Sequence, residues 1–162
     1  MNIIESLNLI AECLEDKNEH EVFAMYRVIN TLWENINNLP NNDHYLYNGE
    51  VHIAIALDRK RKISNERIIA VFDDYPLGMT SRDAAILFSK DIVRNKRHNI
   101  FKKYDRYILS GKTVEGININ EIMKDYPNEK CSWDYIKRTS YRDDIVLIMP
   151  GSITDIELTK LN

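Results

Sequence analysis

The sequence predicts an α+β protein, in which an N-terminal amphipathic helical hairpin precedes a mostly antiparallel sheet of three to five strands with packed helices. Apolar residues recur at helical spacing through the first forty residues, and short runs rich in isoleucine and valine follow between polar turns. These runs do not alternate regularly with helices, which disfavours a parallel sheet. The chain has 162 residues, 44% of them hydrophobic, and can bury a core without a disulfide or a metal ion. We expect residues 1–40 to form the hairpin and residues 44–162 the α+β domain, packed as one compact unit.

The first forty residues contain two amphipathic helices. In residues 2–15 the apolar positions are three and four apart, so they share one helix face. Asn18 precedes the second helix, residues 19–38, and Glu21 occupies its capping-box position. That helix carries a heptad seam made of Val22, Met25, Ile29, Leu32 and Ile36. Because the seam is too short for an independent coiled coil, we expect the two helices to pack antiparallel. The seam is also the candidate interface of a homodimer.

Residues 45–72 are expected to form three strands in an antiparallel meander. Asn48-Gly49 separates residues 45–47 from residues 51–57, and this dipeptide favours the type I′ turn of a β-hairpin. Odd-numbered residues of the second strand form a large apolar face. His52 and two alanines form the other face, which is small enough for a helix to pack closely on it. Residues 67–72 are almost entirely apolar and predict a third strand.

A long helix is expected after this meander. Thr80 or Ser81 can cap it, and its apolar stripe continues, with a break near residue 95 or 99, through Ile108. Gly111 is a suitable helix terminator.

The C-terminal third predicts short elements. Residues 113–119 and 144–149 are expected to be strands, the second of them buried. Asn120 and Ser132 each precede a short predicted helix. Residues 152–162 fit either a strand or a helix.

The composition argues against a cofactor or metal site. The chain has only five glycines, and glycine is what allows a backbone to wrap closely around phosphates. Residues 110–113, Ser-Gly-Lys-Thr, are the nearest approach to a phosphate-binding loop, but Arg106 stands where such a loop needs its first glycine. The four histidines have no metal-binding spacing. Cys13 and Cys131 lie far apart in the sequence and outside any cysteine motif, so we expect both to be reduced thiols. We expect no cofactor and no metal.

Two further features concern location. The N-terminal residues carry acidic side chains where a signal peptide needs basic ones. No apolar run approaches transmembrane length. We therefore expect a cytoplasmic protein without a membrane partner.

The charges are unevenly distributed along the chain. Residues 1–50 contain nine acidic and two basic residues, whereas residues 51–112 contain seven acidic and fourteen basic ones. Residues 113–162 contain nine acidic and six basic residues, and the whole chain has a net charge of −3. Asymmetry of this size influences the choice of partner rather than the fold.

The basic residues concentrate in segments 59–62 and 94–106. We take as candidate binding residues, for a protein or a nucleic acid, Arg59, Lys60, Arg61, Lys62, Arg94, Lys96, Arg97, Lys102, Lys103 and Arg106. Aromatic residues interrupt the second segment, and on a helix they form an inward stripe while the cations spread over several faces. This arrangement weakens the case for nucleic acid and favours a protein partner.

Our first hypothesis is a small cytoplasmic protein that acts by binding another protein. An inhibitor, an antitoxin-like or immunity-like factor, or a phage-encoded modulator of a host enzyme needs charge complementarity and no catalytic residues. The acidic face of the hairpin is the candidate partner surface, made of Glu12, Glu15, Asp16, Glu19 and Glu21. The abundance of Asn, Ile, Lys and Tyr, whose codons are A/T-rich, suggests a phage or mobile element.

Two alternatives remain open. The second hypothesis is a DNA- or RNA-binding regulator that uses segments 59–62 and 94–106. The third is a metal-dependent nuclease, in which Asp58 and Lys60 at one strand end act with Asp73 or Asp74 at the end of the neighbouring strand. Charged turns at strand ends are common, so we do not expect an enzyme.

Overall fold

The computed structural model describes residues 2–16, 19–73, 77–96, 102–126, 145–149 and 151–161, without the side chains of residues 11–26, 70–73 and 95–96. The α+β prediction is confirmed, because these residues form five α-helices and a five-stranded antiparallel sheet. The chain divides into a first unit within Met1–Leu46 and Glu121–Arg142 and a second unit within Tyr47–Asn120 and Asp143–Asn162. No helix among the described residues is both long enough and apolar enough to cross a membrane.

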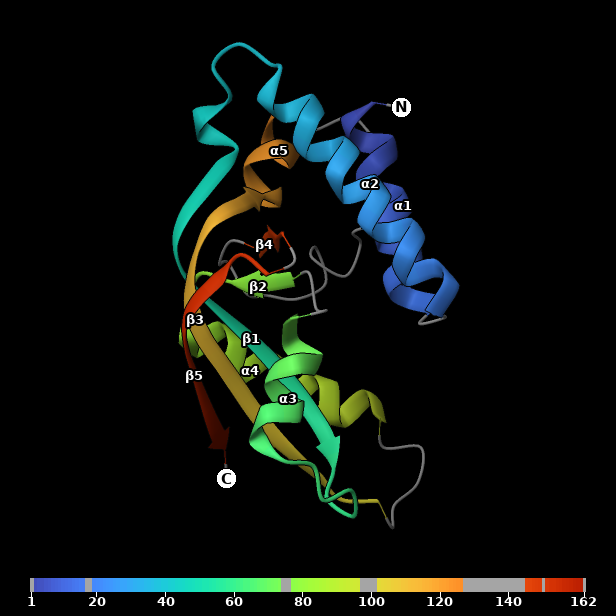
Figure 1. Cartoon of the computed structure of the whole chain (residues 1–162), viewed down its shortest axis with the longest axis vertical. Coiled ribbons are helices and arrows are strands. Elements are labelled where there is room, and N and C mark those ends of the chain that lie inside the picture. The colour runs from blue at the N-terminus through green and yellow to red at the C-terminus, as the bar shows by residue number, and fades with distance from the viewer. Residues whose placement is uncertain are drawn as a thin grey trace. The chain divides into compact units, whose positions relative to one another are not determined.

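The first unit contains the predicted helical hairpin. Helices α1 (Ile3–Asp16) and α2 (Glu19–Asn37) pack side by side (Figure 1). Asn2 and Glu5 begin α1 as a capping box, in which each side chain accepts a hydrogen bond from the other residue's backbone N–H, at 2.8 and 3.0 Å. The buried apolar side chains of the two helices are Ile3, Ile4, Leu7, Ile10, Ile29, Leu32 and Ile36.

A side-chain amide ends α2. Nδ2 of Asn42 donates hydrogen bonds to the carbonyl oxygens of Ile36 at 3.0 Å and Asn37 at 3.2 Å. These carbonyls lie in the last turn, where a helix has no internal donor for them. The 3₁₀ turn η1 (Asn42–His44) then leads into the sheet, and Asn41 before it has a φ of 58°.

The second unit is built on the sheet. Its strands are β1 (Leu46–Asp58), β2 (Leu77–Met79), β3 (Tyr104–Asn118), β4 (Ile145–Ile148) and β5 (Ile153–Leu161). The order is β1-β2-β4-β3-β5, and β1 also pairs with β3, so the first four strands close on one another. The long strand β3 pairs with β4 through Gly116–Asn118 and with β5 through Arg106–Thr113. This pairing makes β3 the strand on which the unit is assembled.

One helix packs on each face of this sheet (Figure 1). Helix α3 (Asn65–Asp73) contributes Ile68 to the core, whose other buried members are Val51, Ile53, Leu109, Val146 and Ile148. Helix α4 (Arg82–Lys96) packs on β3 and β2, and Nη1 of Arg106 donates a hydrogen bond to the buried Ser89 hydroxyl at 3.1 Å. The predicted cap of this helix is Ser81, whose Oγ accepts a hydrogen bond from Ala84 N at 3.3 Å. The helix α5 (Ile119–Asp125) follows β3 directly.

The predicted hairpin at Asn48-Gly49 is wrong, because β1 runs through both residues. Tyr47, Val51, Ile53, Ile55 and Leu57 all pack in or against the core, so one alternation continues along the whole strand. Gly49 is in phase with these residues and has an extended φ of 159°. The partners of β1 are therefore distant strands rather than its own N-terminal part.

The strand predicted at residues 67–72 is also wrong, and with it the three-stranded meander. These residues belong to α3, which is N-capped by Ser64: its Oγ accepts from Arg67 N at 3.3 Å and its carbonyl from Ile68 N at 3.0 Å. Ile63 and Ile68 occupy the positions of a hydrophobic staple on either side of that cap, and both belong to the core region. Local capping therefore outweighs the β propensity of the apolar run.

The helix predicted to continue through Ile108 ends at Lys96, and β3 begins at Tyr104. Gly111 is not a helix terminator, since it lies inside β3 where β5 crosses closely. A Cβ there would be 2.5 Å from Cγ2 of Ile153 and 2.8 Å from the carbonyl oxygen of Thr154. Glycine is required at position 111 because β5 approaches too closely for a side chain, and not because the backbone has a left-handed φ.

The remaining elements agree with the sequence where the structure describes them. The buried strand predicted at residues 144–149 is confirmed as β4. The short helix predicted near Asn120 is α5, and the tail left open is the strand β5. The helix predicted after Ser132 lies outside the described residues.

Candidate functional site

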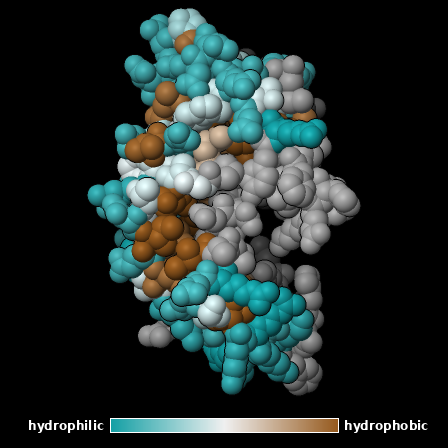
Figure 2. Space-filling model, viewed as in Figure 1, coloured by the Kyte–Doolittle hydropathy of each residue, from teal (hydrophilic) through white to brown (hydrophobic). Residues whose placement is uncertain are grey.

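Two polar sites stand out on the second unit, and the first is a basic cluster where β1 ends and β3 begins. Arg59 N donates a hydrogen bond to the Lys103 carbonyl at 2.9 Å, so two segments 44 positions apart in sequence lie together. We call this cluster the basic end; it consists of the exposed residues Arg59, Lys60, Arg61, Lys62, Lys102 and Lys103. Figure 2 shows hydrophilic side chains covering the end of β1 and the turn into α3.

The carboxylate of Asp105 compensates part of this charge. Its oxygens lie 2.9 Å from Nε of Arg59 and 3.5 Å from Nζ of Lys160, which links β1, β3 and β5. Burial raises the pKa of Asp105, but the hydrogen bond from Arg59 and the charge of Lys160 outweigh it and leave the pKa below its ordinary value. Asp58 is half-buried, and its Oδ1 accepts a hydrogen bond from Lys60 N at 3.0 Å. Most cations of the basic end therefore remain available to a ligand.

The other predicted basic residues do not join this cluster. Arg106 is partly buried and holds β3 to α4 through Ser89, so its role is structural. Arg94 is exposed on α4, with Nη1 3.7 Å from Oδ1 of Asp91. The side chain of Lys96 and all of Arg97 lie outside the described residues.

The hairpin surfaces are only partly described. The side chains of Glu12, Glu15, Asp16, Glu19 and Glu21, together with Val22 and Met25, are outside the described part. Ile29, Leu32 and Ile36 are fully buried within the single chain, so these three side chains are not available to a dimer interface. A homodimer stays a prediction.

The nuclease hypothesis loses its geometric basis. It required Asp73 to end a strand next to Asp58, but Asp73 ends helix α3, and Asp74 lies outside the described residues. Among the side chains that the structure describes, no three metal-ligating residues gather into a cation site.

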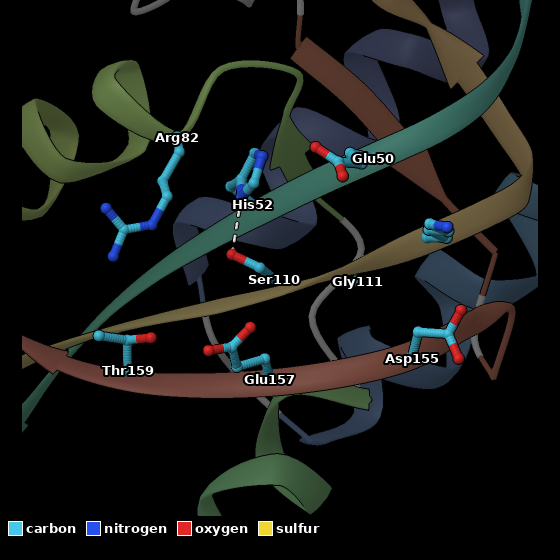
Figure 3. Close-up of a pocket in the computed structure, with 9 residues that line it drawn as sticks. Glu50, His52, Arg82, Ser110, Gly111, Asp155, Glu157 and Thr159 are labelled. Carbon is cyan, nitrogen blue, oxygen red and sulfur yellow. Dashed lines mark hydrogen bonds between the residues drawn. The ribbon is translucent and has the colours of Figure 1, made fainter.

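The second site is a polar cavity of about 430 Å³ over β1, β3, β5 and the start of α4. It is lined by Glu50, His52, Arg82, Ser110, Gly111, Lys112, Asp155, Glu157 and Thr159. Figure 3 shows Glu50 and His52 on β1, Arg82 at the start of α4, and Glu157 on β5 with its carboxylate directed toward Ser110. Ser110 and Glu157 are direct cross-strand partners.

A buried hydrogen bond forms the floor of this cavity. His52 is 7% exposed, and its Nδ1 lies 2.7 Å from the Ser110 hydroxyl oxygen. Burial lowers the pKa of His52, and the charge of Arg82 adds to this effect while Glu50 opposes it, so the ring is neutral near pH 7. A serine within hydrogen-bonding reach of a histidine is an element of nucleophilic catalysis. Among the described residues, however, no group holds the other ring nitrogen, which is what orients the base in such sites.

A third polar cluster belongs to the first unit. The Tyr45 hydroxyl donates to Oδ2 of Asp125, and Nε2 of His44 lies 3.1 Å from the same oxygen. Burial and the bond to Asp125 raise the pKa of Tyr45 to about 12. The hydrogen bonds from Tyr45 and His44 lower the pKa of Asp125. These contacts join η1 to the end of α5 and have a structural role.

Comparisons with protein families, with curated protein sequences and with solved structures found no match to this chain. Function is therefore inferred from the two polar sites of the second unit. The sequence showed the basic end as part of two cationic segments that together form one candidate surface, and the contact of Arg59 with Lys103 brings part of that set together. The cavity was missed, since Ser110 and Glu157 are brought to His52 only by strand pairing.

Proposed function

We propose that the protein binds nucleic acid through the phosphate backbone, using the basic end. The observation that carries this proposal is the hydrogen bond from Arg59 N to the Lys103 carbonyl, which joins two cationic segments into one exposed cluster. Between residues 58–62 and 102–105 there are six cations and two carboxylates, one of which, Asp105, is occupied by Arg59 and Lys160. Such a cluster fits a polyanion, whose regularly spaced phosphates displace counterions as they bind.

The main objection from the sequence no longer applies. It rested on a helix over residues 94–106 that would spread the cations over several faces. Because β3 begins at Tyr104, Lys102 and Lys103 instead enter the sheet beside the β1 turn. Four lysines and two arginines therefore share one end of the unit, where they can contact neighbouring phosphates.

The protein-binding hypothesis stays a second proposal of a different kind. Its acidic face lies outside the described side chains, and no described feature favours an inhibitor, an antitoxin-like factor or a phage-encoded modulator. An acidic protein surface could also meet the basic end. The two partners differ in their dependence on salt, because only a nucleic acid releases condensed counterions in proportion to the number of phosphates contacted.

The test is fluorescence anisotropy with labelled duplex and single-stranded oligonucleotides over a salt series. If four of the six cations contact phosphates, the plot of log K against log salt has a slope of about −3 to −4. The variant with Lys60, Lys62, Lys102 and Lys103 all changed to Gln should bind more weakly and lose most of that slope. These side chains are exposed, so the substitutions leave the Arg59–Asp105 contact intact.

Lys112→Gln is the matched control. Lys112 is exposed on β3, nine residues after Lys103, or about 30 Å along an extended chain. Its removal should leave both affinity and slope unchanged. Absence of binding at low salt, or equal loss from Lys112→Gln and from the fourfold variant, would refute nucleic-acid binding by the basic end.

A further inference from the structure

The buried His52 has an unused ring nitrogen. Its Nδ1 is engaged with the Ser110 hydroxyl at 2.7 Å, whereas Nε2 has no hydrogen-bond partner among the described residues. Burying a polar nitrogen without a partner costs about 1–3 kcal/mol, so such groups are usually satisfied by water or by a ligand. His52 lines the cavity, and Figure 3 shows its second nitrogen on the ring side away from Ser110, between Arg82 and Glu50.

Charged side chains of both signs line the cavity around His52. Three carboxylates line the cavity, Glu50 from β1 and Asp155 and Glu157 from β5, and two cations, Arg82 and Lys112, accompany them. The formal charge of the lining is therefore −1 when His52 is neutral. Figure 3 places Arg82 on one side of His52 and Glu50 on the other, with Glu157 and Asp155 along β5.

We propose that this cavity binds a small basic amino acid, a molecule with one carboxylate, an α-ammonium group and a cationic side chain. The carboxylate pairs with Arg82, and the two cationic groups pair with carboxylates of β1 and β5. The ligand charge of +1 offsets the lining charge of −1, and the α-ammonium group or the carboxylate reaches Nε2 of His52. A volume of about 430 Å³ lies in the range of small-molecule sites, which is roughly 300–1,000 Å³.

Other ligand classes fit this lining less well. A phosphate or sugar phosphate would face three carboxylates against two cations. An apolar ligand would leave the charged side chains of the wall without water or partners. Among the described residues no three metal-ligating side chains lie close enough together to hold a metal ion, so the carboxylates of this lining do not form a cation site.

The test is a titration of the full chain with L-arginine, followed by the nitrogen chemical shifts of the His52 ring and by calorimetry. Binding should shift the Nε2 resonance, which a surface interaction would leave unchanged. Agmatine lacks the carboxylate, N-acetyl-arginine lacks the α-ammonium group, and glycine lacks the side-chain cation. Each should bind at least about tenfold more weakly than L-arginine, since each loses one charge-assisted contact.

Variants on two sides of the cavity distinguish specific binding in the cavity from non-specific binding. Arg82→Gln and Glu157→Gln change exposed side chains, so both should fold. Arg82→Gln should reduce the preference for L-arginine over agmatine. Glu157→Gln should weaken the binding of L-arginine about tenfold. Lys60→Gln in the basic end is the control that leaves this binding unchanged. The proposal is overturned if about 10 mM L-arginine leaves the His52 nitrogens unmoved, or if binding is indifferent to both cavity variants.

Discussion

Substitution of Gly111 tests how β3 and β5 meet, because helix termination and close strand contact predict different responses. At a helix terminus with left-handed φ, asparagine is tolerated and alanine is not. In the structure Gly111 lies within β3, and an added Cβ would be 2.5 Å from Ile153 Cγ2 and 2.8 Å from Thr154 O. Both Gly111→Ala and Gly111→Asn should therefore destabilise the protein.

The expected loss of stability on substitution of Gly111 follows from these distances. Carbon atoms pack at about 3.5–4.0 Å, so the new methyl group overlaps Ile153 by about 1 Å. Ile153 can change rotamer, but Thr154 O is a backbone atom in the paired strand and can move only with β5. Overpacking of this kind costs about 1–3 kcal/mol, from which the lower chain entropy of alanine recovers about 0.5–1 kcal/mol. We expect a net loss of about 1–2 kcal/mol in the free energy of unfolding.

Gly151 provides the matched control. Its φ is +73° and no atom lies within 4 Å of a Cβ built there, so its substitution meets only a backbone cost. Gly151→Ala should cost about 1 kcal/mol, while Gly151→Asn should be nearly neutral because asparagine tolerates this conformation. Urea unfolding followed by circular dichroism gives the free energies, and hydrogen exchange at residues 106–113 and 153–161 localises the loss. A neutral Gly111→Asn would refute the strand contact.

Three further predictions concern a helix cap and two titrating groups. Ser64→Ala should lower the free energy of unfolding by about 1 kcal/mol, measured by urea unfolding, because it removes the N-cap of α3. Since burial lowers the pKa of His52 below its unfolded value near 6.5, its contribution to stability is complete above about pH 6.5 and declines as the pH falls toward the folded pKa. His52→Asn should flatten this decline in unfolding curves recorded between about pH 7 and pH 5. The pKa of Asp105 is lowered, so its stabilisation is present above about pH 3.9 and is lost as the pH falls through the folded pKa; Asp105→Asn should remove that acid-dependent part.

The elements that the sequence predicted correctly are those decided by local signals. The spacing of Ile3, Leu7 and Ile10 fixes α1, and Ser81 caps α4 as expected. For two of the wrongly predicted elements, α3 and the start of β1, the sequence also contains local signals that indicate the observed structure. Ile63 and Ser64 form the staple and cap of α3, and Tyr47 continues the core alternation of β1 through Gly49.

The other differences depend on contacts that are remote in sequence. Residues 104–108 carry apolar groups that fit a helix stripe as well as a strand, and the choice is made by pairing with β1 and β5. The same pairing brings Lys103 to Arg59 and Ser110 to His52. A register over more than forty residues has no local signature, so neither site could be assembled from the sequence alone.

The two sites share β3 but use it differently, and this predicts that they act independently. Lys103, just before β3, belongs to the basic end, whereas Ser110 lies in the cavity, about 23 Å further along the strand. Between them, Leu109 and Ile108 are buried on opposite faces and fix β3 against α3 and α4. We expect a strand held in this way to keep its packing when a ligand binds, and coupling between sites requires an alternative state. Occupying the cavity with L-arginine should therefore leave the salt slope of nucleic-acid binding unchanged, and the fourfold lysine variant should leave the affinity for L-arginine unchanged.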